Sequence, residues 1–295
     1  MARKIFFKAA GLIFALTLIF TAKVSAEGIW RLDGEILNEL PRNFRTFDDL
    51  NISASGQPSM QSLFVLSNEL KNKLAGDGNI YIVDLREESH GFFNGFPVSW
   101  YVNKNLANFF KPRYQIASIE AEQLQNMLGR QVDLLPLGNE DKKLFKPVNI
   151  FVDSAITESE AATALGLIYV RFPVTDMYFP TPEVVDQFIN FVANLGENDL
   201  VHFHCQAGHG RTTTFTVMYD ILKSPEKSLG EICKRHAENG GSDLLTRKVD
   251  NGDRDYYVEA HNLRAEELIK FFFYVRGVQR EEIGLQWSEY LKAKG

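Results

Sequence analysis

The fold is decided by one run of the sequence, Leu200-Val201-His202-Phe203-His204-Cys205-Gln206-Ala207-Gly208-His209-Gly210-Arg211-Thr212-Thr213. Its first five residues form an apolar run that predicts a buried strand, and apolar helical spacing follows from Gly210 to Leu222. In α/β proteins, ligands bind beyond the carboxyl ends of strands, where the next helix offers free N–H groups and partial positive charge. The loop between this strand and this helix is therefore expected to be a binding site.

The residues of this loop are suited to binding a phosphate group and to attacking it. The small residues Ala207, Gly208 and Gly210 allow successive backbone N–H groups to converge on an anion. Arg211 can hold two phosphate oxygens in the planar fork of its guanidinium group. Such positive surroundings lower the pKa of a cysteine thiol, so Cys205 is expected to be a thiolate near neutral pH. A thiolate in a phosphate-binding loop predicts nucleophilic phosphoryl transfer through a phosphocysteine.

Chance does not readily produce this pattern. An arginine six residues after a cysteine is common by itself, but glycine has a usage of roughly 7%, so requiring Gly208 and Gly210 as well makes the combination rare. Cys233 serves as an internal control, because Asn239 stands six residues after it and no glycine lies between them. The sequence therefore favours a chemical role for Cys205 over a purely structural one.

Strands and helices alternate along the rest of the chain. Apolar runs predict strands at Ile80–Leu85 and Leu167–Phe172, and Val98–Val102 is a further apolar stretch. Helices are expected at Ile119–Leu128, from a capping box at Thr157 and Glu160, from Thr181, from Leu229, and from about Asp255 to Arg276. This alternation favours an α/β fold with a central mixed or parallel sheet flanked by helices. The irregular, charged stretch Arg130–Lys146 is assigned to a small β-rich insertion at about 92–150.

The motif His-Cys-x2-Gly-x-Gly-Arg-Thr resembles the phosphate-binding loop of the protein tyrosine phosphatase superfamily. More narrowly, the chain resembles the PTP-like (cysteine) phytases of bacteria, which dephosphorylate inositol hexakisphosphate. The narrower resemblance covers the chain roughly from Pro41 to the C-terminus. It rests on Val83–Gly91, Thr175-Asp176 with Pro180–Glu183, the loop itself, and Glu238–Gly241. It implies a protein-tyrosine-phosphatase-like core over residues 27–295 and a polyphosphorylated small-molecule substrate.

The reaction also needs a general acid, because an alkoxide leaves only when it is protonated. Asp176 follows a predicted strand and precedes the Thr181 helix, which matches the acid loop of the family; the alternative is a solvated turn or a helix cap. The family often has histidine after this aspartate, whereas Met177 stands here, which puts one substrate contact in doubt. Thr212 is expected to stabilise the sulfur of Cys205 when it leaves in the second step.

The resemblance also implies contacts between the substrate and residues outside the nucleophile. His204 is expected to orient the loop rather than act as a base. Glu87 and His90, with Arg86, follow a strand end and either contact the substrate or brace the loop by ion pairs. Val249–Asp253 replaces a stretch that is richer in lysine in the family, so weaker affinity for the most phosphorylated inositol is expected. The other candidate contacts are Gln206, Ala207, Gly208, His209 and Gly210 in the loop, and Arg45, Arg247, Lys248 and Arg254 for outer phosphates.

Composition limits the class of protein. The chain has 295 residues, 45% of them hydrophobic and 24% charged, with a mean hydropathy of −0.18, which excludes a disordered chain, a fibre and a multi-pass membrane protein. The net charge of −6 argues against general nucleic-acid binding. Two cysteines are too few for a disulfide framework or a structural zinc site. The sequence shows no His/Asp cluster at metal-ligand spacing, and the expected reaction requires no cofactor or metal.

Residues 1–26 are predicted to be a signal peptide. They contain a basic n-region, an apolar stretch at 9–21 and the small-x-small pattern Val24-Ser25-Ala26. The apolar run is shorter than the roughly 20 residues that a membrane-spanning helix needs. Cleavage after Ala26 would export the protein without stable membrane association, and would leave a net charge of −10 because the segment holds four basic residues and no acid.

Other functions remain open at this stage. A phosphotyrosine phosphatase uses the same chemistry, and a deep aromatic-lined slot would favour it over a flat basic surround. A catalytically inactive module that binds phosphoinositides or phosphoproteins is opposed by the presence of Cys205, Arg211 and Asp176. Sulfur transfer by a rhodanese-like loop fits the Gly-x-Gly-Arg-Thr pattern less well. The sequence does not determine the oligomeric state.

Overall fold

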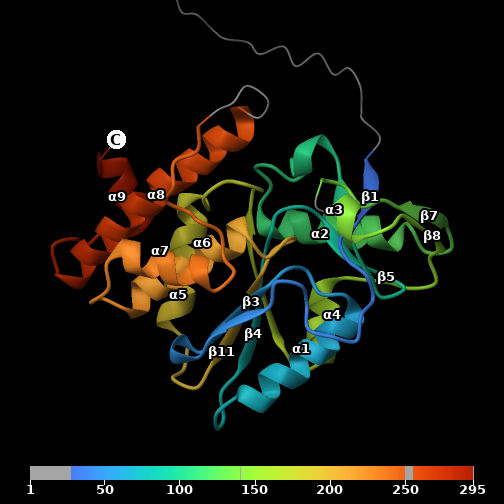
Figure 1. Ribbon diagram of the computed structural model, residues 1–295, viewed down its shortest axis with the longest axis horizontal. Coiled ribbons are helices and arrows are strands. Elements are labelled where there is room, and N and C mark those ends of the chain that lie inside the picture. The colour runs from blue at the N-terminus through green and yellow to red at the C-terminus, as the bar shows by residue number, and fades with distance from the viewer. Residues whose placement is uncertain (1–27, 140, 250–254, 295) are drawn as a thin grey trace, which may run out of the picture.

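The centre of the molecule is a five-stranded sheet in which four parallel strands carry one antiparallel strand at the edge (Figure 1). The computed structural model describes residues 28–139, 141–249 and 255–294. The strand order is β10 (Ile168–Val174), β4 (Ile80–Arg86), β11 (Leu200–His204), β3 (Ile52–Ser55) and β2 (Arg45–Phe47). β11 pairs in parallel with β3 and β4, and β2 pairs antiparallel with β3.

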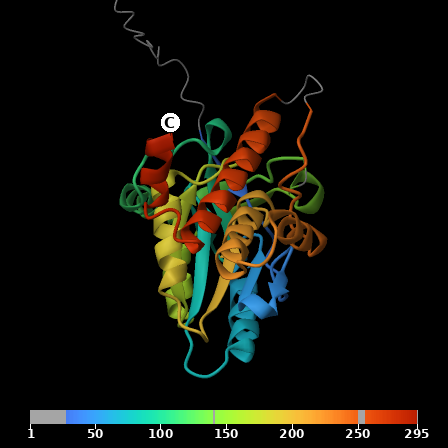
Figure 2. The same cartoon turned by 90° about the vertical axis from the view of Figure 1, so that its left-hand side faces the viewer.

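Helices cover both faces of this sheet, as Figures 1 and 2 show. Successive residues of a strand point to opposite faces, so Ile80 and Ile82 of β4 enter one core while Val83 and Leu85 enter the other. The larger core is covered by α5 (Pro182–Ala193), α6 (Gly210–Lys223), α7 (Leu229–Glu238), α8 (Asp255–Gln279) and α9 (Trp287–Lys294). The other face is covered by α1 (Met60–Lys73) and α4 (Glu158–Ala164). The predicted fold class is confirmed.

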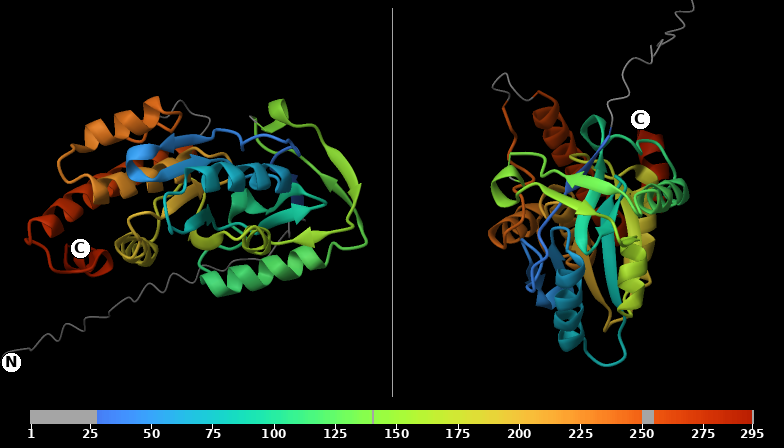
Figure 3. Two further views of the ribbon diagram at one scale, coloured as in Figure 1. Left: turned by 90° about the horizontal axis from the view of Figure 1, so that it is seen from below. Right: turned by 90° about the vertical axis from the view of Figure 1, so that its right-hand side faces the viewer.

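A group of antiparallel strands lies on the side of the main sheet away from α8 and α9 (Figures 1 and 3). One sheet has the order β1 (Ile29–Leu32), β6 (Phe96–Tyr101), β5 (His90–Phe93) and β9 (Ala155–Ile156), and a second pairs β7 (Gln131–Leu134) with β8 (Val148–Phe151). The same part of the chain holds α2 (Arg113–Gln125), α3 (Asp141–Leu144) and the short helix η2 (Asn103–Asn105), while η1 (Asp48–Leu50) follows β2. The first sheet therefore combines strands from within residues 92–150 with strands from outside those limits.

Several elements differ from the sequence-based expectations, and among them α1, β2 and β3 lie before Asn79, where no helix or strand was predicted. The helix predicted at Ile119–Leu128 spans Arg113–Gln125, because Pro112 forms its N-cap. The stretch predicted to be irregular contains β7, in which only alternate residues are buried. α9 was not predicted, and it is held by the buried Trp287, whose ring packs against Phe271 and Tyr274. Within the described ranges, no helix is both long and apolar enough to cross a membrane.

Candidate active site

The thiol of Cys205 is presented at the centre of the sheet. Cys205 directly follows β11, and β11 lies between two parallel strands, so three carboxyl ends meet at this loop. Gly208 has a φ of +78°, and a Cβ atom on it would lie 2.5 Å from the backbone nitrogen of Gly56, which follows β3. A glycine is therefore required here by both conformation and space.

The loop is held from outside by its carbonyl groups. Nη2 of Arg42 donates to the carbonyl of Gln206 at 2.9 Å, and the backbone N–H of Gln57 donates to the same oxygen at 3.1 Å. Nδ2 of Asn43 donates to the carbonyl of Gly208, also at 2.9 Å. Because these carbonyls are bonded outward, the loop can turn N–H groups toward its centre, as an anion site requires.

Arg211 is fixed by a buried chain of ion pairs. Its Nη1 and Nη2 atoms donate to the two carboxylate oxygens of Glu88 at 2.7 and 2.9 Å, and Nη1 also donates to the carbonyl of Val174 at 3.2 Å. Arg86 donates to Glu88 at 2.9 Å and to Asp33 at 2.8 Å. Burial raises the pKa of Glu88, but Arg211 and Arg86 outweigh it and hold that pKa well below its usual range. Glu88 is therefore a permanent anion that orients the arginine fork.

The electrostatic surroundings separate the two cysteines. Burial raises the pKa of the Cys205 thiol, but the charge of Arg211 and the polar side-chain and backbone groups of Thr212 outweigh burial and lower it. Burial without such partners raises the pKa of Cys233 to about 12. Both cysteines are free. The thiolate character expected of Cys205 thus has a structural basis that Cys233 lacks.

Asp176 lies beside this arginine in the loop after β10. Its Oδ1 is 3.4 Å from Nη2 of Arg211 and accepts the N–H of Met177 at 3.1 Å, while Nδ2 of Asn105 donates to Oδ2 at 3.3 Å. Met177 has a φ of +74°, a strained conformation for a side chain of this kind, and it forms the turn that directs Asp176 back toward the thiol. The side chain of Asp176 is 38% exposed, so solvent and a leaving group both have access to it.

Glu87 is a second carboxyl group near the loop. It is buried, and burial raises its pKa although a hydrogen bond from Thr175 lowers it. Its Oε2 has no hydrogen-bond partner among the described residues. A carboxyl group whose pKa is raised in this way is the alternative candidate for the general acid, whereas Glu88 is excluded by its two arginine partners.

Two further arginines approach the thiol. Arg45 on β2 is buried and donates to the carbonyl of Asn43 at 3.1 Å; burial lowers its pKa to about 10, and Cys205 partly offsets that effect. Arg264 on α8 is also buried, and burial lowers its pKa while Asp176 and Cys205 raise it. A Cβ atom on Gly210 would lie 2.5 Å from Nη1 of Arg264, so the guanidinium group lies directly over the start of α6.

Sequence reasoning identified Arg45 but missed Arg264. The available signal was its position in the helical pattern, because Ala260, Arg264 and Leu268 are spaced four residues apart and all three are buried. An arginine on the buried stripe of an amphipathic helix needs an anion or a ligand there.

Several other predicted site residues lie beneath the loop or away from it. His204, His90 and Gln206 are buried; Gln206 donates to Asp141 at 3.3 Å, and both histidines face Glu158. Nδ1 of His209 lies 3.2 Å from Asn43, and Ala207 is half-buried. The side chain of Arg247 is 77% exposed and pairs with Glu266 at 3.6 Å, while the backbone of Lys248 is bound by Asn262. Arg254 and the predicted signal peptide lie outside the described residues.

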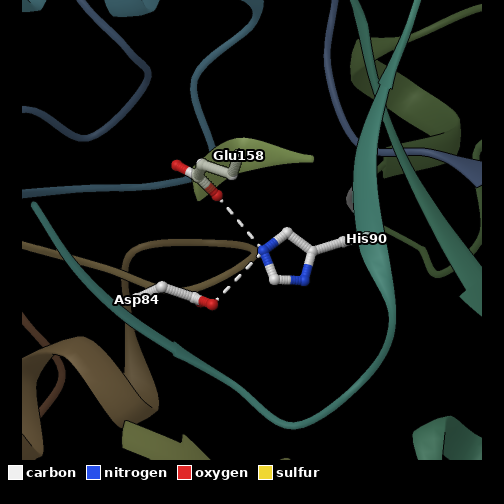
Figure 4. A group of neighbouring side chains, drawn as sticks. All are labelled: Asp84, His90 and Glu158. Carbon is white, nitrogen blue, oxygen red and sulfur yellow. Dashed lines mark hydrogen bonds and ion pairs between the residues drawn. The ribbon is translucent and has the colours of Figure 1, made fainter. Parts of the chain in front are cut away.

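One group has the spacing of metal ligands. Oxygens of Asp84 and Glu158 and a ring nitrogen of His90 lie within 4.8 Å of one another, although Glu158 is distant in sequence from the other two (Figure 4). Donors already occupy these oxygens: the hydroxyl of Tyr169 and Nε of Arg171 lie 2.7 and 3.0 Å from Oδ2 of Asp84. A cationic neighbour and satisfied oxygens fit a hydrogen-bonded network better than a metal ion.

The fold and the loop define an α/β protein with a low-pKa thiol at the centre of an arginine-bearing loop. A family model of the PTP-like phytases, whose description names inositol hexakisphosphate, matches residues 83–223. A PTP-like phytase from Bdellovibrio bacteriovorus is 32% identical with a TM-score of 0.73, and the match covers 89% of this chain and 94% of that one. The chain belongs to the PTP-like phytase family.

Three matches to longer proteins were also found. The tandemly repeated phytase of Mitsuokella multacida is 32% identical with a TM-score of 0.83, and the match covers 90% of this chain and 49% of that one. The myo-inositol phosphatase of the same organism, in complex with myo-inositol-(1,3,4,5)-tetrakisphosphate, gives a TM-score of 0.82. Effector protein hopD2 of Pseudomonas syringae pv. tomato is 29% identical over 160 residues, 53% of this chain and 34% of that protein. The chain thus spans about half the length of the Mitsuokella phytase and about a third of the length of hopD2.

Proposed function

We propose that the protein is an exported phosphatase that hydrolyses phosphate monoesters of myo-inositol polyphosphates through a phosphocysteine on Cys205. The observation that carries this proposal is a set of three buried arginines around one thiol. Arg45, Arg211 and Arg264 each interact electrostatically with Cys205. Each also has a buried guanidinium nitrogen without a hydrogen-bond partner in the described part of the chain.

Unpaired donors of this kind point to a polyanionic ligand. Leaving a buried donor unsatisfied costs about 1–3 kcal/mol, and more when the group is charged. The loop and Arg211 together can bind one phosphate group, because a guanidinium group contacts two oxygens of the same phosphate. Arg45 and Arg264 come from β2 and α8, on other parts of the fold, and supply donors for additional phosphates. Binding of an inositol tetrakisphosphate by the similar Mitsuokella protein supports this substrate class.

The reaction follows from the positions of these groups. The Cys205 thiolate attacks phosphorus, so that an S–P bond forms as the bond between phosphorus and the inositol oxygen breaks. Asp176 gives its proton to that departing oxygen. In the second step, water attacks phosphorus and gives a proton to Asp176, and the S–P bond breaks. Arg211 binds the phosphoryl oxygens in both steps, and Thr212 stabilises the released thiolate.

The decisive experiment compares phosphate release from inositol hexakisphosphate and from a phosphotyrosine peptide. The wild-type protein is expected to have the higher kcat/KM for the inositol substrate. Cys205→Ser is expected to abolish turnover while still binding it, because a serine hydroxyl is not ionised in this site; Cys233→Ser is the matched control and keeps activity. Turnover by Cys205→Ser at the wild-type rate would refute covalent cysteine catalysis.

The second candidate substrate is a phosphotyrosine peptide. A hollow of about 110 Å³ adjoins Asp176, and it is lined by the rings of Tyr101, Tyr256 and Tyr257, which suit an aryl group. The same hollow also holds Lys104, whose ammonium lies 4.8 Å over the ring of Tyr256, and this cation favours a further phosphate. A higher kcat/KM for the peptide than for the inositol substrate would establish the second candidate.

Export is the remaining part of the proposal, and it rests on residues 1–26. The similarity to an effector protein of Pseudomonas syringae supports it. Expression of the full chain in a bacterium should yield protein outside the cytoplasm whose first residue is Glu27. Recovery of the whole chain, starting at Met1, from the cytoplasm would contradict export.

A further inference from the structure

A buried carboxylate connects two parts of the fold beneath the loop. Glu158 is the first residue of α4, and its side chain is fully buried. Its Oε1 lies 3.1 Å from Nε2 of His204, the residue before the nucleophile. Its Oε2 lies 3.1 Å from Nε2 of His90 on β5 (Figure 4) and accepts Nε2 of Gln57 at 2.9 Å. One carboxylate thus accepts hydrogen bonds from Gln57 and His90 and lies at ion-pair distance from His204, so it connects three segments of the chain.

The charges around this carboxylate keep it ionised. Burial raises the pKa of Glu158, but the two histidines outweigh burial and hold that pKa well below its usual range. Burial lowers the pKa of His204, but Glu158 outweighs it, so that the pKa of this histidine is raised. The other titratable and charged groups that act on His204 include His202 on the same strand and Asp84 and Arg86 on β4. Glu158 therefore favours an imidazolium cation next to Cys205 in the chain.

Gln57 links the same carboxylate to the phosphate-binding arginine. Its Oε1 accepts Nη1 of Arg86 at 2.8 Å, and Nε of Arg86 donates to Glu88 at 2.9 Å. Glu88 in turn holds both Nη atoms of Arg211. Each of these side chains is buried, so no water competes for the donors. The carboxylate of Glu158 therefore contacts His204 directly. It also stands at one end of a chain of hydrogen bonds that runs through Gln57, Arg86 and Glu88 and ends at Arg211.

We propose that Glu158 is a positioning residue for the phosphatase reaction, which fixes His204 behind the nucleophile and the Gln57–Arg86–Glu88 chain behind Arg211. The proposal rests on the proposed function only in taking Cys205 as the nucleophile. Neither the identity of the substrate nor export enters it.

The test is the substitution Glu158→Gln, which keeps the shape and removes the charge. An amide has no negative charge, so the ion pair with His204 is lost, while the amide oxygen can still accept from Gln57 and His90. His204 is then expected to become neutral, and because this removes a positive charge one residue from Cys205 in the chain and loosens the loop, the pKa of the thiol is expected to rise. The groups that face this thiol in both variants are Arg211 and Thr212 on α6, Asp176 after β10, Arg45 on β2 and Arg264 on α8.

The pKa of the thiol is read from the rate of alkylation of Cys205 by iodoacetamide as a function of pH, with Cys233→Ser as background. Activity is measured with p-nitrophenyl phosphate, and kcat is expected to fall roughly tenfold to a hundredfold, as is typical when a residue that orients a catalytic group is lost. Glu160→Gln is the matched control, because it removes the same charge from the exposed side of the same helix. It should leave both readouts unchanged.

A merely structural role would give a different result. If Glu158→Gln lowers the melting temperature but, below it, retains the wild-type thiol pKa and kcat, the proposal is wrong. A double variant with His204→Gln is a second check: action through His204 predicts that the two losses are not additive, and additive losses would overturn this part. Because alkylation needs no substrate, a failure here is distinguishable from a wrong assignment of the substrate class.

Discussion

Arg264 on α8 gives the sharpest test of the arginine cluster, because removing it should improve stability and impair activity together. The guanidinium group is buried, and its Nε and Nη1 atoms have no hydrogen-bond partner within the described ranges. Its Nη2 donates to Nδ1 of His261 at 3.2 Å. A buried charge with two unsatisfied donors destabilises a fold in the absence of a ligand.

The substitution Arg264→Met retains most of the apolar stem and removes the charge. Relief of two unsatisfied donors, each costing about 1–3 kcal/mol, is opposed by the loss of the bond to His261 and leaves a net gain of about 1 kcal/mol. In a protein of this size that gain raises the melting temperature by about 2 °C. Removing a charge-assisted contact to a substrate phosphate lowers kcat/KM for inositol hexakisphosphate by roughly tenfold to a hundredfold.

The assay pairs thermal unfolding with the kinetics of two substrates. p-Nitrophenyl phosphate has a single phosphate group, which the loop and Arg211 hold, so its kcat/KM should fall less in Arg264→Met than that for inositol hexakisphosphate; any loss common to both substrates reports the effect of Arg264 on the Cys205 thiolate. Arg247→Met is the matched control, because its side chain is 77% exposed and pairs with Glu266. A variant that is less stable than the wild type and unchanged toward inositol hexakisphosphate would refute the reasoning, since Arg264 would then be a structural cation.

Three further substitutions test the reacting groups. Arg211→Lys should lower kcat roughly 100-fold or more, because an ammonium group reproduces neither the fork held by Glu88 nor its bidentate contact to phosphate. Asp176→Asn should lower kcat for an inositol phosphate by roughly 100-fold and flatten the basic limb of the pH profile, while changing an aryl phosphate much less; if Glu87→Gln does this instead, Glu87 is the acid. Activity requires the thiolate, so a lowered thiol pKa places the acidic limb of the pH profile at lower pH. Thr212→Val removes the hydroxyl group that stabilises the thiolate, so the pKa of Cys205 should rise by roughly one unit and both the acidic limb and the alkylation profile should move to higher pH. Thr212→Ser keeps the hydroxyl group and should not cause this shift.

The strands β4, β10 and β11 and the nucleophile loop were predictable because their signals are local, whereas β2 and β3 of the same sheet were not predicted. A short apolar run, a glycine pair and a helix start lie within residues 200–213, and each has one physical interpretation. Gly208 is an example, since its positive φ and its approach to Gly56 leave no room for a side chain. α9 was not predictable in this way, because its stability comes from Trp287 packing on Phe271 of α8 rather than from its own pattern.

Contacts between distant segments explain most of what the sequence did not show. The spacing of Ala260, Arg264 and Leu268 indicates that Arg264 lies on the buried side of its helix, but only the packing of α8 places it over the loop. Glu158 was predicted only as part of a helix that begins with a capping box, yet its carboxylate joins β5 to β11. For His90 and Glu87 the sequence left two roles open, contact with the substrate and bracing of the phosphate-binding loop by ion pairs. The buried partners of His90 favour bracing, and those of Glu87 leave a carboxyl oxygen unpaired beside the loop.

The buried ion pairs beneath the loop are better explained by orientation than by stability. Asp33, Arg86, Glu88 and Arg211 form a continuous chain of charges with almost no exposed surface. Removing such charges from water costs several kcal/mol each, and apolar replacements of a buried ion pair are often neutral or stabilising. The same replacements here would leave both Nη atoms of Arg211 without their partner Glu88. The guanidinium group would then be free to rotate, and it would no longer be oriented to bind two phosphate oxygens at once. A chain of ion pairs that adds little to folding therefore has its physical reason in holding one guanidinium group at a fixed angle to the thiol.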